Sequence, residues 1–158
     1  RLIILHEISE GLIKYSDTRT RLKSNETALR ELNAYLMGVK SATYHMLKGL
    51  INEREYEELV VMLLVVGLDK LSRMANDTSV LEYARGFAIV FNYLEQTGAI
   101  TPSKAKLKID LPKVMQGVDA LATVVQSIYH DSKFEESEKL FDTYGSFEIA
   151  KRLPLLKL

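Results

Sequence analysis

The sequence has 158 residues, 21 basic and 21 acidic side chains that give a formal net charge of zero, and no cysteine. The length suits one domain with a real core, and the lack of cysteine excludes disulfides, thiol catalysis and cysteine-ligated metal sites within the chain. Balanced charge removes the general argument for a polybasic protein that binds nucleic acid or membranes. A cytoplasmic protein is expected, and the apolar start has no signal-peptide cleavage site.

Helical periodicity dominates the chain before Pro102, which is its first proline. A first helix is predicted from Leu2 to Leu22. A second begins at Ser24 or Asn25 and runs to Leu50, because its apolar residues recur at alternating spacings of three and four. The wide apolar seam of this second helix indicates the inner face of a bundle. The alternative is an exposed seam that binds a partner.

The stretch 59–68, LVVMLLVVGL, is ten apolar residues in succession. It is too short to cross a bilayer, which takes about 20 residues. Asn52 and Glu55 form a capping-box pattern ahead of it, and this favours a helix over a buried strand. A helix that is apolar on all sides is surrounded by other helices, and Gly67 would let one of them cross closely. The competing interpretation is that a second subunit covers one side.

The next helix is predicted to start at Ser79, with Glu82 as its capping partner, and to end before Gly98, where a left-handed residue is expected. In the segment 99–111 that follows, apolar and charged residues alternate with the period of a strand. A lone strand needs a partner, so this segment is expected to form a small hairpin or an open edge.

Three shorter patterns complete the chain, with predicted helix starts near Asp110, Ser132 and Ser146. The predicted fold class is therefore all-α: a compact bundle of five to six main helices with one short extended or hairpin segment around residues 99–111. The chain is expected to form a single helical domain, 1–158, with an apolar C-terminal tail, 153–158. The tail is expected to dock on the bundle or on a partner chain through its leucines: Leu153, Leu155, Leu156 and Leu158.

Catalytic signatures are missing from the sequence. His6 and Glu10 share a helix face, which is typical of a solvated polar pair, and no histidine has the E-x-x-H spacing of a bundle di-iron site. The acidic clusters 53–58 and 135–138 open predicted helices, where carboxylates complement the helix dipole. Phosphate-binding glycine loops and nucleophile elbows are absent. No metal, cofactor or catalytic residue is predicted, and the chain is interpreted as not an enzyme.

The extended segment carries the basic residues that are singled out for function. Lysines on one face of a strand could follow a phosphate backbone without reading bases. The alternative is that they protect a strand edge from aggregation. The predicted nucleic-acid-binding residues are Lys104, Lys106, Lys108 and Lys113, with Arg19 and Arg21 at the end of the first helix.

These observations favour a non-catalytic helical subunit of a larger assembly that contacts nucleic-acid backbone within a nucleoprotein complex. Its expected partners are other protein subunits or copies of itself, with RNA or DNA through phosphate contacts and no membrane. One alternative is a DNA-binding regulatory module with a wing-like hairpin at residues 98–111. Another is an enzyme whose site cannot be read from sequence, which a pocket with strongly shifted titratable groups would reveal.

Overall fold

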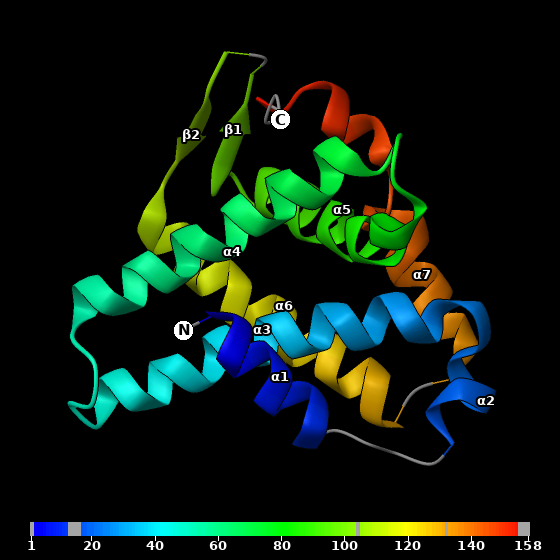
Figure 1. The fold of residues 1–158 in the computed structure, drawn as a ribbon, viewed down its shortest axis with the longest axis horizontal. Coiled ribbons are helices and arrows are strands. Elements are labelled where there is room, and N and C mark those ends of the chain that lie inside the picture. The colour runs from blue at the N-terminus through cyan, green and yellow to red at the C-terminus, as the bar shows by residue number, and fades with distance from the viewer. Residues whose placement is uncertain (1, 13–16, 104, 132, 155–158) are drawn as a thin grey trace.

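A computed structural model describes residues 2–12, 17–103, 105–131 and 133–154, and it confirms the all-α bundle with one hairpin (Figure 1). The main helices are α1 (Leu2–Leu12), α3 (Glu26–Leu47), α4 (Glu53–Arg73), α5 (Leu81–Gln96), α6 (Leu111–Asp131) and α7 (Phe134–Tyr144). Shorter elements are α2 (Thr18–Leu22) and the 3-10 turns Lys23–Asn25, Thr78–Val80 and Phe147–Lys151. None of the described helices is both long and apolar enough to cross a membrane.

Helix α3 forms the centre of the bundle, and α1, α4, α5 and α6 all pack against it. The predicted seam is its inner face, because Leu29, Leu32, Leu36 and Val39 are buried in the hydrophobic core. Fully burying each of these side chains contributes about 1.5–3 kcal/mol. The bundle interpretation of this helix is therefore confirmed as far as Val39, whereas Leu50, where the helix was predicted to end, lies beyond α3 and is 70% exposed.

Helix α4 begins at the predicted capping box. Asn52 Oδ1 accepts a hydrogen bond from the Glu55 backbone N–H at 3.0 Å, and Glu55 Oε2 accepts one from the Asn52 backbone N–H at 3.0 Å. Gly67 lies where α4 crosses α5, and a Cβ there would meet Phe87 Cδ1 at 2.6 Å and Phe91 Cε2 at 2.7 Å. The close crossing expected at Gly67 is confirmed.

The apolar stretch in α4 is not surrounded on all sides by the described chain. Val60, Leu63 and Leu64 are buried, whereas Val61 and Met62 are 40% and 49% exposed. The expectation of a fully wrapped helix is wrong for this reason: α4 lies at the edge of the bundle, and one of its faces has no neighbouring helix over it among the described residues.

The first predicted helix is interrupted, because α1 ends at Leu12 and α2 begins at Thr18. The start of α5 also differs from the expectation. Asp77, not Ser79, acts as the cap: its carboxylate accepts a hydrogen bond from the Ser79 backbone N–H at 3.0 Å and opens a 3-10 turn before the helix. Glu82 pairs with Arg85 at 2.9 Å and makes no capping box.

The predicted hairpin consists of β1 (Ile100–Pro102) and β2 (Leu107–Ile109), which are antiparallel. It follows Gly98, whose φ of +69° is the expected left-handed conformation. In the tail, Leu153 is 3% exposed and packs on the core of its own bundle. The other predicted interface leucines lie outside the described residues: Leu155, Leu156 and Leu158.

Candidate metal centre

Helix α1 turns a polar stripe, rather than its isoleucines, toward the centre of the bundle. His6 and Ser9 are buried, with exposed fractions of 4% and 8%, whereas Ile8 is 53% exposed. Close packing against α3 permits this arrangement at Gly38, where a Cβ would lie 3.2 Å from Leu5 Cβ and 3.4 Å from the His6 backbone nitrogen. The interpretation of His6 as part of a solvated pair is therefore wrong.

His6 lies close to carboxylates from two helices. Its Nε2 is 3.9 Å from Glu10 Oε2 on α1 and 3.3 Å from Glu31 Oε2 on α3. The neighbouring Glu7 is exposed, and ligand atoms of His6, Glu7 and Glu10 all lie within 4.8 Å of one another. An imidazole nitrogen and carboxylate oxygens are donors that hold divalent ions such as Zn²⁺ in proteins.

Arg30 holds the far oxygen of both carboxylates. Its Nε is 3.3 Å from Glu10 Oε1, and a terminal nitrogen is 3.1 Å from Glu31 Oε1. Each carboxylate therefore uses Oε1 toward Arg30 and Oε2 toward His6. Hydrogen bonding of this kind orients carboxylates that bind a metal.

Glu31 is ionised in this setting although it is buried, at 5% exposed. Burial by itself raises the pKa of Glu31, but contacts with His6 and Arg30 outweigh it and lower the pKa below its ordinary value. Glu31 Oε2 and His6 Nδ1 are buried without a hydrogen-bond partner among the described residues. Such atoms are costly to leave unsatisfied, and the charged oxygen facing Nε2 fits a site that accepts a cation.

Two tyrosines line the inner side of this cluster. The Tyr35 ring lies 4.0 Å from the His6 ring, centroid to centroid, and burial raises the pKa of Tyr35 to about 12. On α5, burial first and then the charge of Glu31 raise the pKa of Tyr83. Both tyrosines are therefore neutral near pH 7, and Tyr83 can donate to Glu31.

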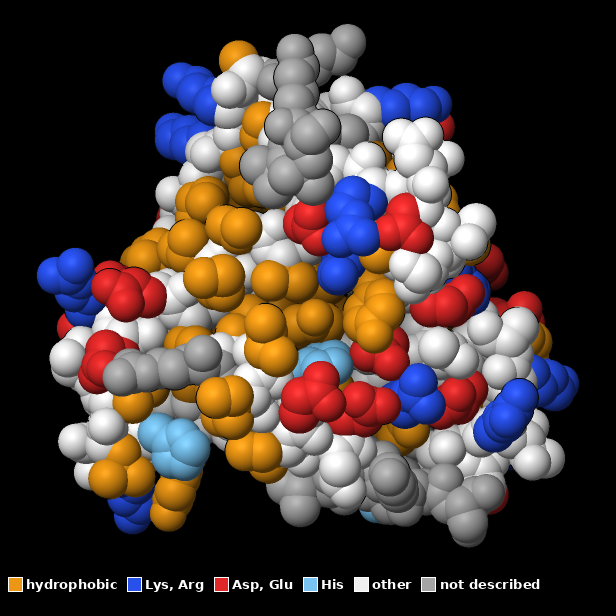
Figure 2. Space-filling model, in the orientation of Figure 1, with side chains coloured by type: hydrophobic (Ala, Val, Ile, Leu, Met, Phe, Trp, Pro, Cys, Tyr) orange, Lys and Arg blue, Asp and Glu red, His pale blue; other side chains and the backbone are white. Residues whose placement is uncertain are grey.

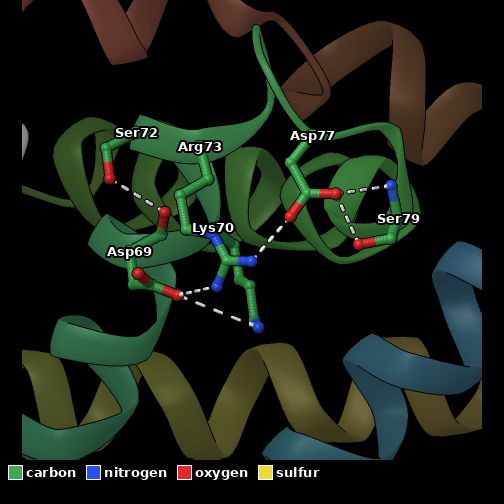
Figure 3. A network of polar contacts seen from close by, with 6 residues as sticks. All are labelled: Asp69, Lys70, Ser72, Arg73, Asp77 and Ser79. Carbon is green, nitrogen blue, oxygen red and sulfur yellow. Dashed lines mark hydrogen bonds and ion pairs between the residues drawn. The ribbon is translucent and has the colours of Figure 1, made fainter. Parts of the chain in front are cut away.

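An ion-pair network fixes the end of α4 against the segment that leads to Tyr83 (Figure 3). Arg73 bridges Asp69 at 3.4 Å and Asp77 at 2.6 Å, and hydrogen bonding to Asp77 raises the pKa of Arg73. Lys70 Nζ in the same turn lies 5.2 Å above the Tyr83 ring. The network thus contacts Tyr83 through Lys70.

The face that includes α1 and α4 is mixed in character. Figure 2 shows acidic and basic side chains gathered beside a histidine, below a broad apolar area. A pocket of about 230 Å³ lies between the two helices, lined by Leu2, Ile3, Leu59, Met62 and Val66 with Glu55 and Glu58. The titratable groups with shifted pKa values lie outside this pocket. The sign of an enzyme anticipated from the sequence, a pocket lined by strongly shifted titratable groups, is therefore not found here.

The predicted nucleic-acid residues do not form one surface. Arg21 donates to the Tyr129 carbonyl at 2.8 Å, and Lys113 pairs with Asp110 at 3.3 Å. Arg19 on α2 is exposed, but α2 and the hairpin lie at opposite sides of the fold in Figure 1. Lys106 and Lys108 are exposed on the hairpin, and Lys104 lies outside the described residues.

Glu7 and Glu31 were not singled out from the sequence, although a signal for the site exists in it. Residues 6–10 read H-E-I-S-E. A metalloprotease helix of the H-E-x-x-H type carries two histidine ligands four residues apart and a glutamate that acts as general base. Glu10 follows His6 at the spacing at which that motif has its second histidine, so a search for paired histidines passes over residues 6–10.

Histidine and carboxylate side chains thus face each other from neighbouring helices, and facing helices are where helical bundles place their metal ligands. No protein-family model matches the sequence, and no curated protein matches it. The fold is similar to DPP III from Caldithrix abyssi, with 21% identity, a TM-score of 0.76, and coverage of 98% of this chain and 33% of that one.

A second similar structure is dipeptidyl-peptidase III from Corallococcus sp. strain EGB, with 16% identity and a TM-score of 0.73. It is matched over 99% of this chain and 32% of its own length, so the present chain spans about a third of each of these two chains. Identities this low show a shared fold.

These comparisons overturn the functional interpretation drawn from the sequence. The prediction of a non-catalytic subunit of a nucleoprotein complex is wrong, because the proteins that share the fold are peptidases. The DNA-binding alternative fails on the same ground. The expectation that the chain is not an enzyme is contradicted as well, since the fold is one that peptidases contain. The alternative of an enzyme with an unrecognised site is the one in agreement with the comparisons.

Proposed function

We propose that this chain is the helical part of a metal-dependent peptidase, with His6, Glu10 and Glu31 as ligands of a divalent ion. The observation that carries the proposal is the position of one buried imidazole between carboxylates of two helices, at 3.9 Å and 3.3 Å. The fold of the two peptidases supports the reaction class.

A divalent ion bound there would lower the pKa of a water molecule and polarise a peptide carbonyl. Glu7 is the general base in this proposal: it is exposed and adjacent to His6, and its carboxylate accepts the proton of the attacking water. Arg30 orients Glu10 and Glu31 through its ion pairs with both, and its contact with Glu31 helps to lower the pKa of that carboxyl. Tyr35 and the α1–α3 contact hold the His6 ring in place.

Isothermal titration of the chelator-treated chain with Zn²⁺ tests the proposal. Wild type is expected to bind one ion per chain, and His6→Ala and Glu31→Gln are expected to lose that binding because each removes a ligand. His130→Ala is the matched control, since His130 is exposed and lies on α6 away from this cluster. Zn²⁺ binding that is equal in wild type and His6→Ala would refute the site and leave the cluster as an ion-pair network.

The cytoplasmic location and the partner interface at the tail stay predictions.

Circular dichroism of each variant in the Zn²⁺ titration would separate loss of a ligand from loss of the fold. A peptide, hydrolysed at an amide bond, is the substrate class that this chemistry fits.

A further inference from the structure

The ligand set of the proposed site contains one nitrogen donor and two oxygen donors. Glu10 follows His6 by four residues, so both side chains lie on the same face of α1. In a helix of the H-E-x-x-H type the second of these positions is a histidine. A carboxylate at this position, in place of an imidazole, adds a negative charge to the site. It also replaces a nitrogen ligand with a harder oxygen ligand.

The contacts with Arg30 fix how each carboxylate can bind. Oε1 of Glu10 and Oε1 of Glu31 both face the Arg30 guanidinium, at 3.3 Å and 3.1 Å. Only the Oε2 atom of each side chain faces His6 Nε2. The protein would therefore offer a divalent ion one oxygen from each of these glutamates and one nitrogen.

We propose that Glu10 is a specificity-determining residue that widens the metal preference of the site from Zn²⁺ toward oxygen-preferring divalent ions, of which Mn²⁺ is the best fit. This inference rests on the proposed function. Carboxylate and water ligands suit Mn²⁺, whereas imidazole strengthens Zn²⁺ relative to Mn²⁺. A second carboxylate in place of a second histidine therefore reduces the advantage of Zn²⁺.

Other oxygen-preferring ions fit the arrangement less well. Ca²⁺ takes six to eight oxygens and commonly binds a carboxylate through both oxygens. Arg30 occupies the second oxygen of each glutamate, so that mode is blocked at both. Mg²⁺ is typically held by oxygen ligands, and the imidazole of His6 is a poor ligand for it. Mn²⁺ accepts one nitrogen together with carboxylate and water oxygens.

The test is the ratio of the dissociation constants for Mn²⁺ and Zn²⁺, measured by titration of the whole chain after chelator treatment. Glu10→His is expected to raise the preference for Zn²⁺ over Mn²⁺ about tenfold or more relative to wild type. Glu10→Gln keeps the shape and removes the charged oxygen, so it should weaken Mn²⁺ more than Zn²⁺ and move the ratio in the same direction. The ratio cancels any general loss of affinity, and circular dichroism checks the fold of both variants.

The outcomes separate the two proposals. Wild type that binds an ion through His6, with a ratio unchanged in both Glu10 variants, would overturn the specificity role and leave the metal site intact. Wild type that binds neither ion would overturn both proposals. His6→Ala should abolish binding of both ions, and His130→Ala should leave the ratio as in wild type.

Discussion

Replacing Gly67 with alanine tests the packing that joins α4 to α5. The added Cβ would lie 2.6 Å from Phe87 Cδ1 and 2.7 Å from Phe91 Cε2, distances that real Cβ atoms do not show. Both phenylalanines are buried, with exposed fractions of 2% and 0%, so their rings have no space to move into without disturbing the core. Overpacking of this kind costs about 1–3 kcal/mol.

Alanine also has the higher helix propensity, which offsets about 1 kcal/mol of that cost. We therefore expect Gly67→Ala to lower the free energy of unfolding by up to about 2 kcal/mol. Urea unfolding followed by circular dichroism, with a chelator present, measures this value. Gly11→Ala is the matched control, because Gly11 is an exposed helical glycine with no atom within 4 Å of its added Cβ. It should be as stable as wild type or more so, and a Gly67→Ala variant as stable as Gly11→Ala would contradict the close crossing.

Two further predictions concern the candidate site. Because the pKa of Glu31 is lowered in the folded state, its ionised form adds stability above the unfolded pKa of about 4.3, and this stability is lost as pH falls through the folded pKa. Chelator-treated Glu31→Gln should therefore lose less stability between pH 6 and pH 3 than wild type does in urea unfolding, and parallel pH profiles would count against the lowered pKa. Gly38→Ala would bring a Cβ to 3.2 Å from Leu5 Cβ and push α1 a few tenths of an ångström from α3. Titration should then show Zn²⁺ affinity about tenfold weaker with the fold retained, and unchanged affinity would show that the α1–α3 distance does not set the site.

Local signals in the sequence were sufficient for most of the fold. The capping box at Asn52, the apolar seam of α3, the close crossing at Gly67 and the left-handed Gly98 all depend on residues near one another in the chain. The same signals did not locate the break between α1 and α2, whose connecting residues 13–16 lie outside the described part of the structure. The predicted cap at Ser79 was also misplaced by two residues, because Asp77 caps a 3-10 turn that precedes α5, and α5 itself begins without a side-chain cap.

The candidate site depends on tertiary packing that periodicity does not report. A period of 3.6 residues places Leu5 and Ile8 on one face of the first predicted helix, yet α1 buries His6 and Ser9 and exposes Ile8. Glu31 belongs to a different helix and meets His6 only because Gly38 lets α1 approach α3. A charged residue on the apolar side of a helix, as Glu31 is on α3, was the available sign of the site. A sequence alone, however, does not show which glutamate is buried.

The most direct test of the proposed centre is a crystal structure of the chain soaked with Zn²⁺, with anomalous diffraction recorded on both sides of the zinc absorption edge. We predict one strong anomalous peak within bonding distance, about 2.0–2.2 Å, of His6 Nε2 and of one carboxylate oxygen each from Glu10 and Glu31. A well-ordered His6 in the same contacts with Glu31, and no anomalous peak beside it, would contradict a metal centre.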